Sequence, residues 1–455
     1  MRANACRVAV GLAGVLAAVT IGAGVASANP TFQLLSHQFS QPPTTAQCQA
    51  SIGIACYNPF QFQKAYGLNG LYADGITGRG RTIVIVDSFG SPTIQSDLAT
   101  FDKDNNLPAP PSFEVIAPVG ASPPYDPGNS TMGGWAIETS LDVEYAHAIA
   151  PGASILLVTT PVAETEGVVG FPEMMNAEKY VIDHNLGDVI SQSFGATEQT
   201  FKNAKNMLDP GMIYSLRYAF QDAYAHHVTV LGSSGDGGAS DLETNGTDFY
   251  PFRVNSWPSA DPLVTSVGGT QLHLTDNGSR FAPDNVWNDQ ALFGSPASGG
   301  GGVSAVFSRP SYQNGVSSVT GDRRGTPDIS LSAAVNGGAN VYLGFTNSGQ
   351  GVTPGYYVIG GTSEASPQFA GVVALADQAA HERLGLLNPS LYKMGDGAGS
   401  GITDITDGNN TVTFTNALKK MVTVIGYHAG AGYDLASGLG TVGGGRFVHQ
   451  LAHGG

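Results

Sequence analysis

One short stretch combines a candidate nucleophile with the backbone geometry that could activate it. Ser363 lies in the sequence Gly360-Gly361-Thr362-Ser363-Glu364-Ala365-Ser366-Pro367, between a strand-like run at 356–359 and an apolar run at 368–376 that is typical of a buried helix. The glycines allow a sharp turn and the close approach of a substrate, and Pro367 suits the first turn of a helix. We therefore expect Ser363 to be exposed just before a helix start, where backbone N–H groups and the helix dipole favour a developing oxyanion. The alternative is that Thr362 or Ser363 only caps the helix.

A second set of residues could supply the base. The segment 133–147 is predicted to form a helix, and Glu138 and Asp142 would lie one turn apart, about 40° round its axis. Two carboxyl groups at that spacing raise at least one pKa and can share a proton. The neighbouring residues are apolar, which favours a catalytic pair over the alternative of two solvated acids on a helix face.

A third acid follows a predicted strand. Asp236 lies in Gly232-Ser233-Ser234-Gly235-Asp236-Gly237-Gly238, directly after the apolar run 228–231. The carboxyl ends of strands in open α/β sheets are where ligand sites form. An Asp between glycines is also a common turn residue, so the sequence leaves both interpretations open.

The elements that must position these residues alternate along the chain. Apolar runs predict strands at 81–87, 113–116, 155–159, 189–195 and 228–231, and helical patterns lie between them. This alternation predicts an α/β fold with a mostly parallel central sheet flanked by helices. The segment 241–355, rich in Gly, Ser, Pro and Asn, is expected to form long ordered loops and short strands of the same domain.

Taken together, these segments resemble the sedolisin family, the serine-carboxyl peptidases, from about Cys48 to Val442. The matching motifs are Gly361-Thr362-Ser363 with Pro367, Glu138 and Asp142 ahead of Ala150-Pro151-Gly152-Ala153, Ser234-Gly235-Asp236, Ser191-Gln192-Ser193-Phe194-Gly195, Val267-Gly268-Gly269-Thr270 and Pro327-Asp328-Ile329-Ser330. The resemblance implies a subtilisin-like fold and a serine-type endopeptidase that cleaves protein substrates at acidic pH, with tripeptidyl-peptidase activity as a further option. It implies Ser363 as the nucleophile, Glu138 as general base held by Asp142, and a protonated Asp236 as donor to the oxyanion.

Oxygen-bearing residues near the C-terminus fit a calcium site. Asp404-Ile405-Thr406-Asp407-Gly408-Asn409-Asn410 is followed by Gly430-Ala431-Gly432-Tyr433-Asp434, with no Cys or His cluster, a composition that suits Ca²⁺. Turn formation alone would give the same residue types. The resemblance implies one structural Ca²⁺ held by the carboxylates of Asp404 and Asp434 and by the carbonyls of Ile405, Gly430 and Gly432.

Two alternative functions are weighed against this one. A subtilisin-type triad would use Asp87 after a buried strand, Ser363 and a histidine, for which His147 is the candidate, although it lies about 180° round the helix from Glu138. A catalytically silent, secreted binding protein on the same scaffold would have no chemical reason to keep all four site residues.

Composition limits the partners and the location. The formal net charge of −16 disfavours nucleic acid and anionic lipid, and a soluble monomer acting on protein or peptide substrates is expected. Residues 1–28 fit a signal peptide, with basic residues, an apolar run and an Ala-x-Ala site, so the mature protein is expected to be secreted and extracellular. Residues 29–56 are expected to form an arm carrying a Cys48–Cys56 disulfide, two free thiols being the alternative. Residues 57–455 would be the peptidase domain, in a form without a long prodomain.

Overall fold

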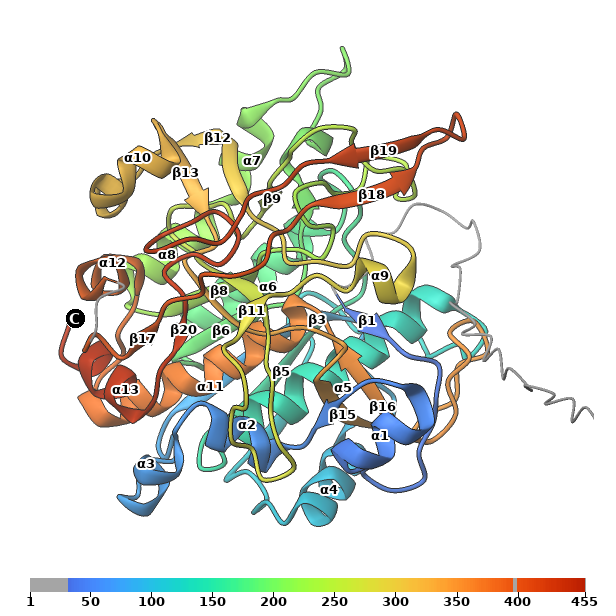
Figure 1. Cartoon of the computed structure of the whole chain (residues 1–455), viewed down its shortest axis with the longest axis vertical. Helices are drawn as coiled ribbons and strands as arrows, with labels where there is room; N and C mark the ends of the chain where they lie inside the picture. Colours follow the sequence, from blue (N-terminus) through green and yellow to red (C-terminus); the bar gives the residue numbers. More distant parts are fainter. Residues whose placement is uncertain (1–31, 396–398, 455) are drawn as a thin grey trace, which may run out of the picture.

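Eight strands form the central sheet of the molecule, and seven of them run parallel (Figure 1). In this computed structural model, which describes residues 32–395 and 399–454, the order is β11-β10-β8-β6-β3-β5-β4, with β14 also paired to β10. Strand β11 is the antiparallel member. The strands are β3 Thr82–Ser88, β4 Phe113–Ile116, β5 Ser154–Thr160, β6 Val189–Gln192, β8 Thr229–Ser233, β10 Thr265–Gln271, β11 Asn285–Val286 and β14 Ile329–Ser332. The predicted α/β fold with a mostly parallel sheet is confirmed, while the predicted signal peptide lies outside the described residues.

Successive strand residues point to opposite faces of the sheet and so divide the core in two. In β3, Ile83 and Ile85 belong to one buried cluster, whereas Val84 and Val86 belong to another. Because both faces are covered, the strand is a continuous apolar run and not an alternating one.

Helices cover each face of the sheet (Figure 1). Helices α5 and α11 pack against each other on the face of Ile83 and Ile85. The helices of that face are α2 Pro59–Ala65, α4 Ile94–Asn105, α5 Ser130–Ile149, α11 Thr362–Ala380, α12 Asn388–Met394 and α13 Gly445–Ala452, and those of the other face are α6 Phe171–Asp183, α7 Pro210–Leu216 and α8 Tyr218–Ala225. No helix within 32–395 and 399–454 has the length and apolar character to cross a bilayer.

Smaller elements surround this core. The N-terminal segment adds to a four-stranded sheet in the order β1-β16-β15-β2, and a disulfide joins Cys48 to Cys56 as expected. The remaining elements are α1 Thr45–Ile52, β1 Gln33–Leu34, β2 Cys56–Tyr57, α3 Asn69–Ala73, β7 Ala196–Thr197, β9 Ser256–Trp257, α9 Gln290–Phe293, β12 Gly302–Ser308, α10 Ser317–Thr320, β13 Arg323–Thr326, β15 Gly338–Leu343, β16 Gly355–Gly360, β17 Ile402–Thr403, β18 Val412–Thr415, β19 Met421–Val424 and β20 Thr441–Val442, with short 3₁₀ turns at Glu198–Thr200 and Ser311–Val316.

The order of the strands brings three polar chain segments together. Strands β3, β6 and β8 are neighbours and end at Ser88, Gln192 and Ser233, so the residues that follow them meet at one edge of the sheet. The middle of α5 and the first turn of α11 carry the other predicted site residues, and the two helices are in contact. This edge is where the candidate site lies.

Candidate active site

Ser363 is the second residue of α11 and is fully buried. Gly361 precedes the helix with a φ of 125°, a conformation that favours glycine and turns the chain from β16 into α11. The expectation of an exposed serine before the helix is therefore wrong, because α11 packs against α5 and its first turn is enclosed. Pro367 is the sixth helical residue and not a first-turn residue. Lacking an N–H, it cannot donate to the carbonyl of Ser363, four residues earlier.

Glu138 and Asp142 lie one turn apart on α5, and both are fully buried. Every residue of the helix from Met132 to Ile149 is buried, so the alternative of two solvated acids is excluded. The hydroxyl of Ser363 interacts with the Glu138 carboxyl group, although neither Glu138 oxygen has a hydrogen bond of ordinary geometry, as is common for catalytic contacts without substrate. Asp142 interacts with Glu138 and accepts a hydrogen bond of 2.9 Å at Oδ1 from Ser193 Oγ.

Asp236 follows β8 and is held by the residue before the serine. Its Oδ1 accepts hydrogen bonds from the backbone N–H of Thr362 at 2.8 Å and from Thr362 Oγ1 at 2.9 Å. Its Oδ2 is buried and has no hydrogen-bond partner. Since Oδ1 accepts from both donors, a proton on this acid belongs on Oδ2, which is then the atom able to donate to a substrate oxygen.

Burial raises the pKa of all three carboxyl groups well above its ordinary value. For Glu138, the nearby charges of Asp87 and Asp236 raise the pKa further, while the interaction with Ser363 lowers it. For Asp142, the charge of Glu138 raises the pKa in addition to burial, whereas the hydrogen bond from Ser193 lowers it. For Asp236, the hydrogen bonds from Thr362 oppose the effect of burial. The site therefore holds protons under conditions in which surface acids are ionised.

Asp87 is a fourth acid of the site, predicted from the sequence only as a member of a Ser-His-Asp triad. It is the penultimate residue of β3 and is fully buried, and burial raises its pKa to about 7, an effect that the neighbouring Thr139 side chain reduces. The signal for it was an acidic residue closing an otherwise apolar strand. His147 does not join it: Nε2 of that ring lies 2.8 Å from the carbonyl oxygen of Pro108 and 3.2 Å from Asp102 Oδ1, on the α4 side of α5. The geometry of a Ser-His-Asp triad is therefore not formed by these residues.

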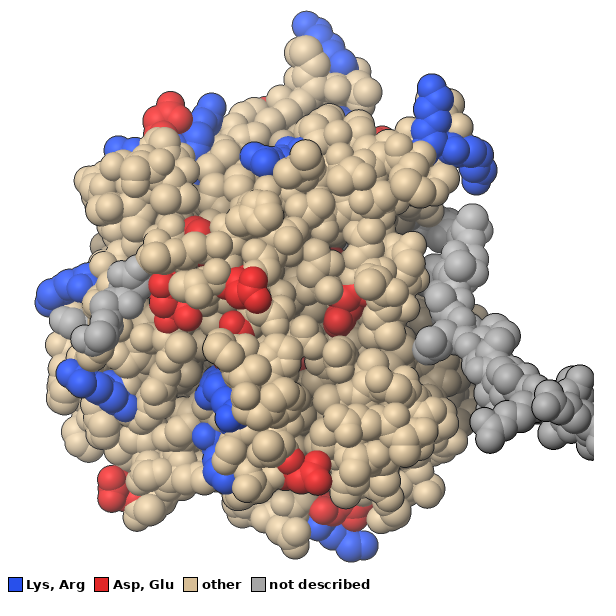
Figure 2. Space-filling model, in the orientation of Figure 1, with Lys and Arg blue, Asp and Glu red and all other residues tan. Residues whose placement is uncertain are grey.

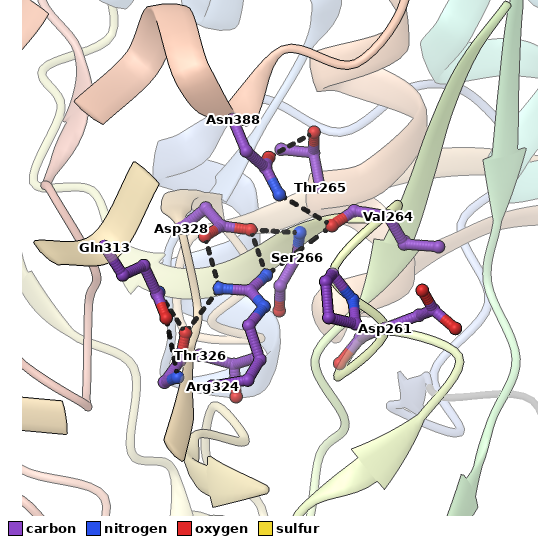
Figure 3. Close-up of polar contacts among 12 residues, drawn as sticks. Asp261, Val264, Thr265, Ser266, Gln313, Arg324, Thr326, Asp328 and Asn388 are labelled. Atoms are coloured by element: carbon purple, nitrogen blue, oxygen red, sulfur yellow. Dashed lines mark hydrogen bonds and ion pairs between the residues drawn. The ribbon is translucent and has the colours of Figure 1, made fainter. Parts of the chain in front are cut away.

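A buried ion pair links β13 to the start of β14 (Figure 3). Arg324 and Asp328 are fully buried, with Nη1 of Arg324 2.7 Å from Oδ1 of Asp328. Asp328 Oδ2 also accepts the backbone N–H of Ser266 at 2.8 Å, and Oδ1 accepts the hydroxyl of Tyr392 at 2.8 Å. These bonds join the start of β14 to β10, which explains the Pro327-Asp328-Ile329-Ser330 motif as a structural element and not a catalytic one.

The predicted calcium residues converge on one loop pair. The backbone N–H of Gly430 donates to Asp434 Oδ2 at 2.9 Å, and that of Gly432 donates to Asp404 Oδ2 at 3.0 Å. Asp434 Oδ1 is also used within its own turn, by the N–H groups of Ala436 and Ser437. Figure 2 shows acidic side chains grouped over these C-terminal loops. The predicted ligands are therefore neighbours, although no group of three or more His, Cys, Asp or Glu placed so that it could hold a metal ion occurs within 32–395 and 399–454.

Comparisons with known proteins agree with this geometry. The profile of the Subtilase family matches residues 128–393. The chain is 30% identical to kumamolisin from a Bacillus species over 430 residues, covering 93% of this chain and 68% of that protein. It is 30% identical to sedolisin from a Pseudomonas species, covering 85% of this chain and 60% of that protein, and 28% identical to human tripeptidyl-peptidase 1, covering 69% and 51%. The chain thus spans between about half and two thirds of the length of these relatives.

The fold comparison points to the same group. The solved structure of Pseudomonas sedolisin, a serine-carboxyl proteinase complexed with two molecules of pseudo-iodotyrostatin, aligns with a TM-score of 0.68 and 28% identity, covering 88% of this chain and 98% of that one. The chain belongs to the Subtilase family of peptidases and, within it, to the sedolisin family.

Proposed function

We propose that this protein is a secreted serine-carboxyl endopeptidase that hydrolyses peptide bonds in proteins at acidic pH through an acyl-enzyme. One observation carries the proposal: Ser363, Glu138, Asp142 and Asp236 come from distant parts of the chain and meet in one buried site. A scaffold that only binds has no need for three carboxyl groups beside a hydroxyl, because burying them without basic partners costs stability.

In the proposed reaction a proton moves from Ser363 to Glu138 and then from Glu138 to the leaving amine. Glu138, ionised, takes the proton of Ser363 as its oxygen attacks the peptide carbonyl carbon. Asp142, held by Ser193, shares a proton with Glu138 and keeps its carboxyl group oriented. Collapse of the tetrahedral intermediate breaks the C–N bond, and Glu138 returns the proton to the leaving amine. Water then attacks the carbonyl carbon of the acyl-serine and gives a proton to Glu138. The ester C–O bond breaks, the carboxylic acid leaves, and Glu138 returns the proton to the Ser363 oxygen.

Asp236 has a different role in this scheme. Its neutral form donates from Oδ2 to the oxygen that becomes negative in the tetrahedral intermediate. Because the donor must be protonated and Glu138 must be ionised, the reaction requires two carboxyl groups in opposite states. Low pH favours the neutral form of Asp236, and we therefore expect activity at acidic pH.

We also propose one structural Ca²⁺ at the C-terminal loops. Two carboxyl groups that accept hydrogen bonds from one glycine turn, with no thiol or imidazole in the predicted set, match the oxygen ligands that Ca²⁺ takes. Asp404 and Asp434 and the carbonyls of Ile405, Gly430 and Gly432 would hold it. The ion would stabilise the folded chain, because it binds only that state.

Secretion is proposed from the sequence of residues 1–28 and is consistent with the disulfide, since disulfides persist in oxidising compartments. The two modes of cleavage differ in the substrate they need: a tripeptidyl-peptidase needs a free amino terminus, whereas an endopeptidase cleaves inside a long chain. Of the two, we propose the endopeptidase mode.

The test is hydrolysis of an acid-denatured protein, at about pH 3–5 where carboxyl groups titrate and again near neutrality. The native chain should release peptides from the interior of the substrate at acidic pH, Ser363→Ala should release none, and His147→Ala should behave like the native chain. Release of only tripeptides would replace the endopeptidase mode. Equal activity of Ser363→Ala, or loss of activity in His147→Ala alone, would overturn the proposal.

A further inference from the structure

The basic side chains of this acidic protein are unevenly distributed. The segments 201–209, 241–253 and 412–425 contain five Lys or Arg residues and four acidic ones, whereas the whole chain has 20 basic and 36 acidic residues. The five are Lys202, Lys205, Arg253, Lys419 and Lys420. One of the four acids, Asp241, is turned inward and accepts hydrogen bonds from Ser256 Oγ and its neighbour's backbone. Figure 2 shows basic side chains on the two loops that project at the top of the view.

The three segments form one continuous end of the molecule, which we call the basic end. Figure 1 shows the β18–β19 hairpin and the loop before α7 projecting from the same side. Lys202 Nζ lies 5.9 Å from the centre of the Tyr250 ring, which contacts Phe252 at 5.2 Å. Arg253 Nε donates to the carbonyl of Ile425 at 2.7 Å, and so ties the middle segment to the base of the hairpin.

Large apolar side chains project from the same end. Leu418 is 75% exposed and Met421 79% exposed at the tip of the hairpin, on either side of Lys419 and Lys420. Ile425, Phe252 and Met207 are also more than half exposed. The Asn416 side chain organises the turn at the tip, because its Oδ1 accepts hydrogen bonds from the backbone N–H groups of Leu418 and Lys420.

We propose that the basic end docks on an anionic lipid surface, with Leu418 and Met421 entering the lipid and the lysines at the level of the headgroups. The combination of lysines with exposed apolar side chains favours lipid over other anionic partners. Lysines alone would bind any polyanion, whereas the exposed apolar side chains beside them become buried only in a partner such as lipid. Lysine also reaches the headgroups from a shallowly inserted tip.

This proposal modifies one expectation from the sequence, where the net charge of −16 disfavours anionic lipid. The net charge acts at long range, whereas binding depends on the local face, and salt screens charges beyond about 8–10 Å. The hairpin is also connected to the candidate active site, because its base packs on the loop that follows Asp236. The N–H of Ala239 donates to the carbonyl of Asn410, and Ala239 and Val412 belong to one buried cluster.

Vesicle binding of the full chain tests the proposal. The probes are vesicles of equal parts phosphatidylglycerol and phosphatidylcholine, and vesicles of phosphatidylcholine alone. We expect binding to the anionic vesicles, weakened about 25-fold in Lys419→Gln/Lys420→Gln, at about fivefold for each lysine, and at least about tenfold in Leu418→Ser/Met421→Ser. The matched controls, Lys103→Gln/Lys393→Gln and Phe281→Ser, alter exposed side chains outside the basic end and should bind like the native chain.

A fluorescent probe reports insertion directly. The native residues Trp135, Trp257 and Trp287 are fully buried, so brominated lipids should quench only a tryptophan placed at the tip. Leu418→Trp should be quenched, and Phe281→Trp should not. Absence of binding by the native chain, or unchanged binding in both double variants, would overturn the proposal. Binding that depends on the lysines alone, extends to soluble polyglutamate and gives no quenching would assign the surface to an acidic polymer instead of lipid.

Discussion

Replacing Asp236 should remove the single hydrogen bond that this residue would give to the reacting oxygen in the proposed mechanism. Oδ1 is occupied by both donors of Thr362, so only Oδ2 can serve a substrate. Loss of one oxyanion donor costs about 2.7–4 kcal/mol, or about 100–1,000-fold in kcat. We therefore expect Asp236→Ala to lower kcat by that factor with a small change in KM, measured on a chromogenic peptide at acidic pH.

Asp236→Asn separates the hydrogen bond from its titration. Burial raises the pKa of Asp236, so the neutral donor is present at low pH and is lost as pH rises through that raised value. An amide keeps an N–H donor and a carbonyl for Thr362 but does not titrate. We expect this variant to retain more activity than Asp236→Ala and to lose the decline of kcat on the alkaline side.

Asp241→Asn is the matched control, since Asp241 is a nearby acid whose pKa is also raised by burial but whose carboxyl group is bonded to Ser256. It should keep both kcat and the alkaline decline. A kcat of Asp236→Ala within about tenfold of the native value, or a kcat of Asp236→Asn that declines at the same pH as that of the native chain, would exclude Asp236 as the oxyanion donor.

Four further changes test separate parts of the account. Glu138→Gln should lower kcat about 100–10,000-fold, because a general base is lost, as measured by single-turnover rates. Asp328→Asn should lower the unfolding free energy by about 3–5 kcal/mol, because a buried guanidinium loses its charged partner, whereas Asp183→Asn, at an exposed pair, should leave urea midpoints unchanged. Chelation of calcium should lower Tm in the native chain and not in Asp434→Asn. Burial raises the pKa of Glu178 from 4.5 to about 8, so its contribution to stability is complete below about pH 4.5 and is lost as pH rises to about 8; Glu178→Gln should weaken this dependence in urea titrations.

Each of these four predictions would be contradicted by a specific result. Glu138→Gln with near-native single-turnover rates would remove the carboxylate base, and an unchanged urea midpoint in Asp328→Asn would mean that the ion pair carries no stability. A Tm indifferent to chelation in the native chain would leave the C-terminal loops as ordinary turns. A native chain as stable at pH 8 as at pH 4.5 would contradict the sign derived for Glu178.

Helical and strand periodicity predicted the fold class and placed Glu138 and Asp142 on one helix face, since both depend on local spacing. Burial of Ser363 could not be predicted, because it depends on how α11 packs against a helix more than 200 residues earlier in the chain. The proximity of Asp87 to Glu138 and Asp142 was also not predicted, because it depends on the order of the strands in the sheet and not on their order in the sequence.

Two central strands fell in a region expected to hold loops and short strands. Strand β10 contains Gly268 and Gly269, residues that normally weaken strands. A Cβ at Gly268 would lie 2.5 Å from Ser330 Oγ, and one at Gly269 would lie 2.8 Å from Ala333 Cβ. Glycine is required there by the close approach of β14 and the segment after it, a tertiary constraint that propensity does not carry.

The central claim is that Ser363 is acylated with Glu138 as its base. The most direct measurement is mass spectrometry of the chain quenched in acid during turnover of a slowly deacylated peptide ester at acidic pH. We predict an acyl adduct on the peptide containing Ser363, formed far more slowly in Glu138→Gln and unchanged in His147→Ala. An adduct on another residue, or no adduct while product accumulates in a burst-free reaction, would contradict the account.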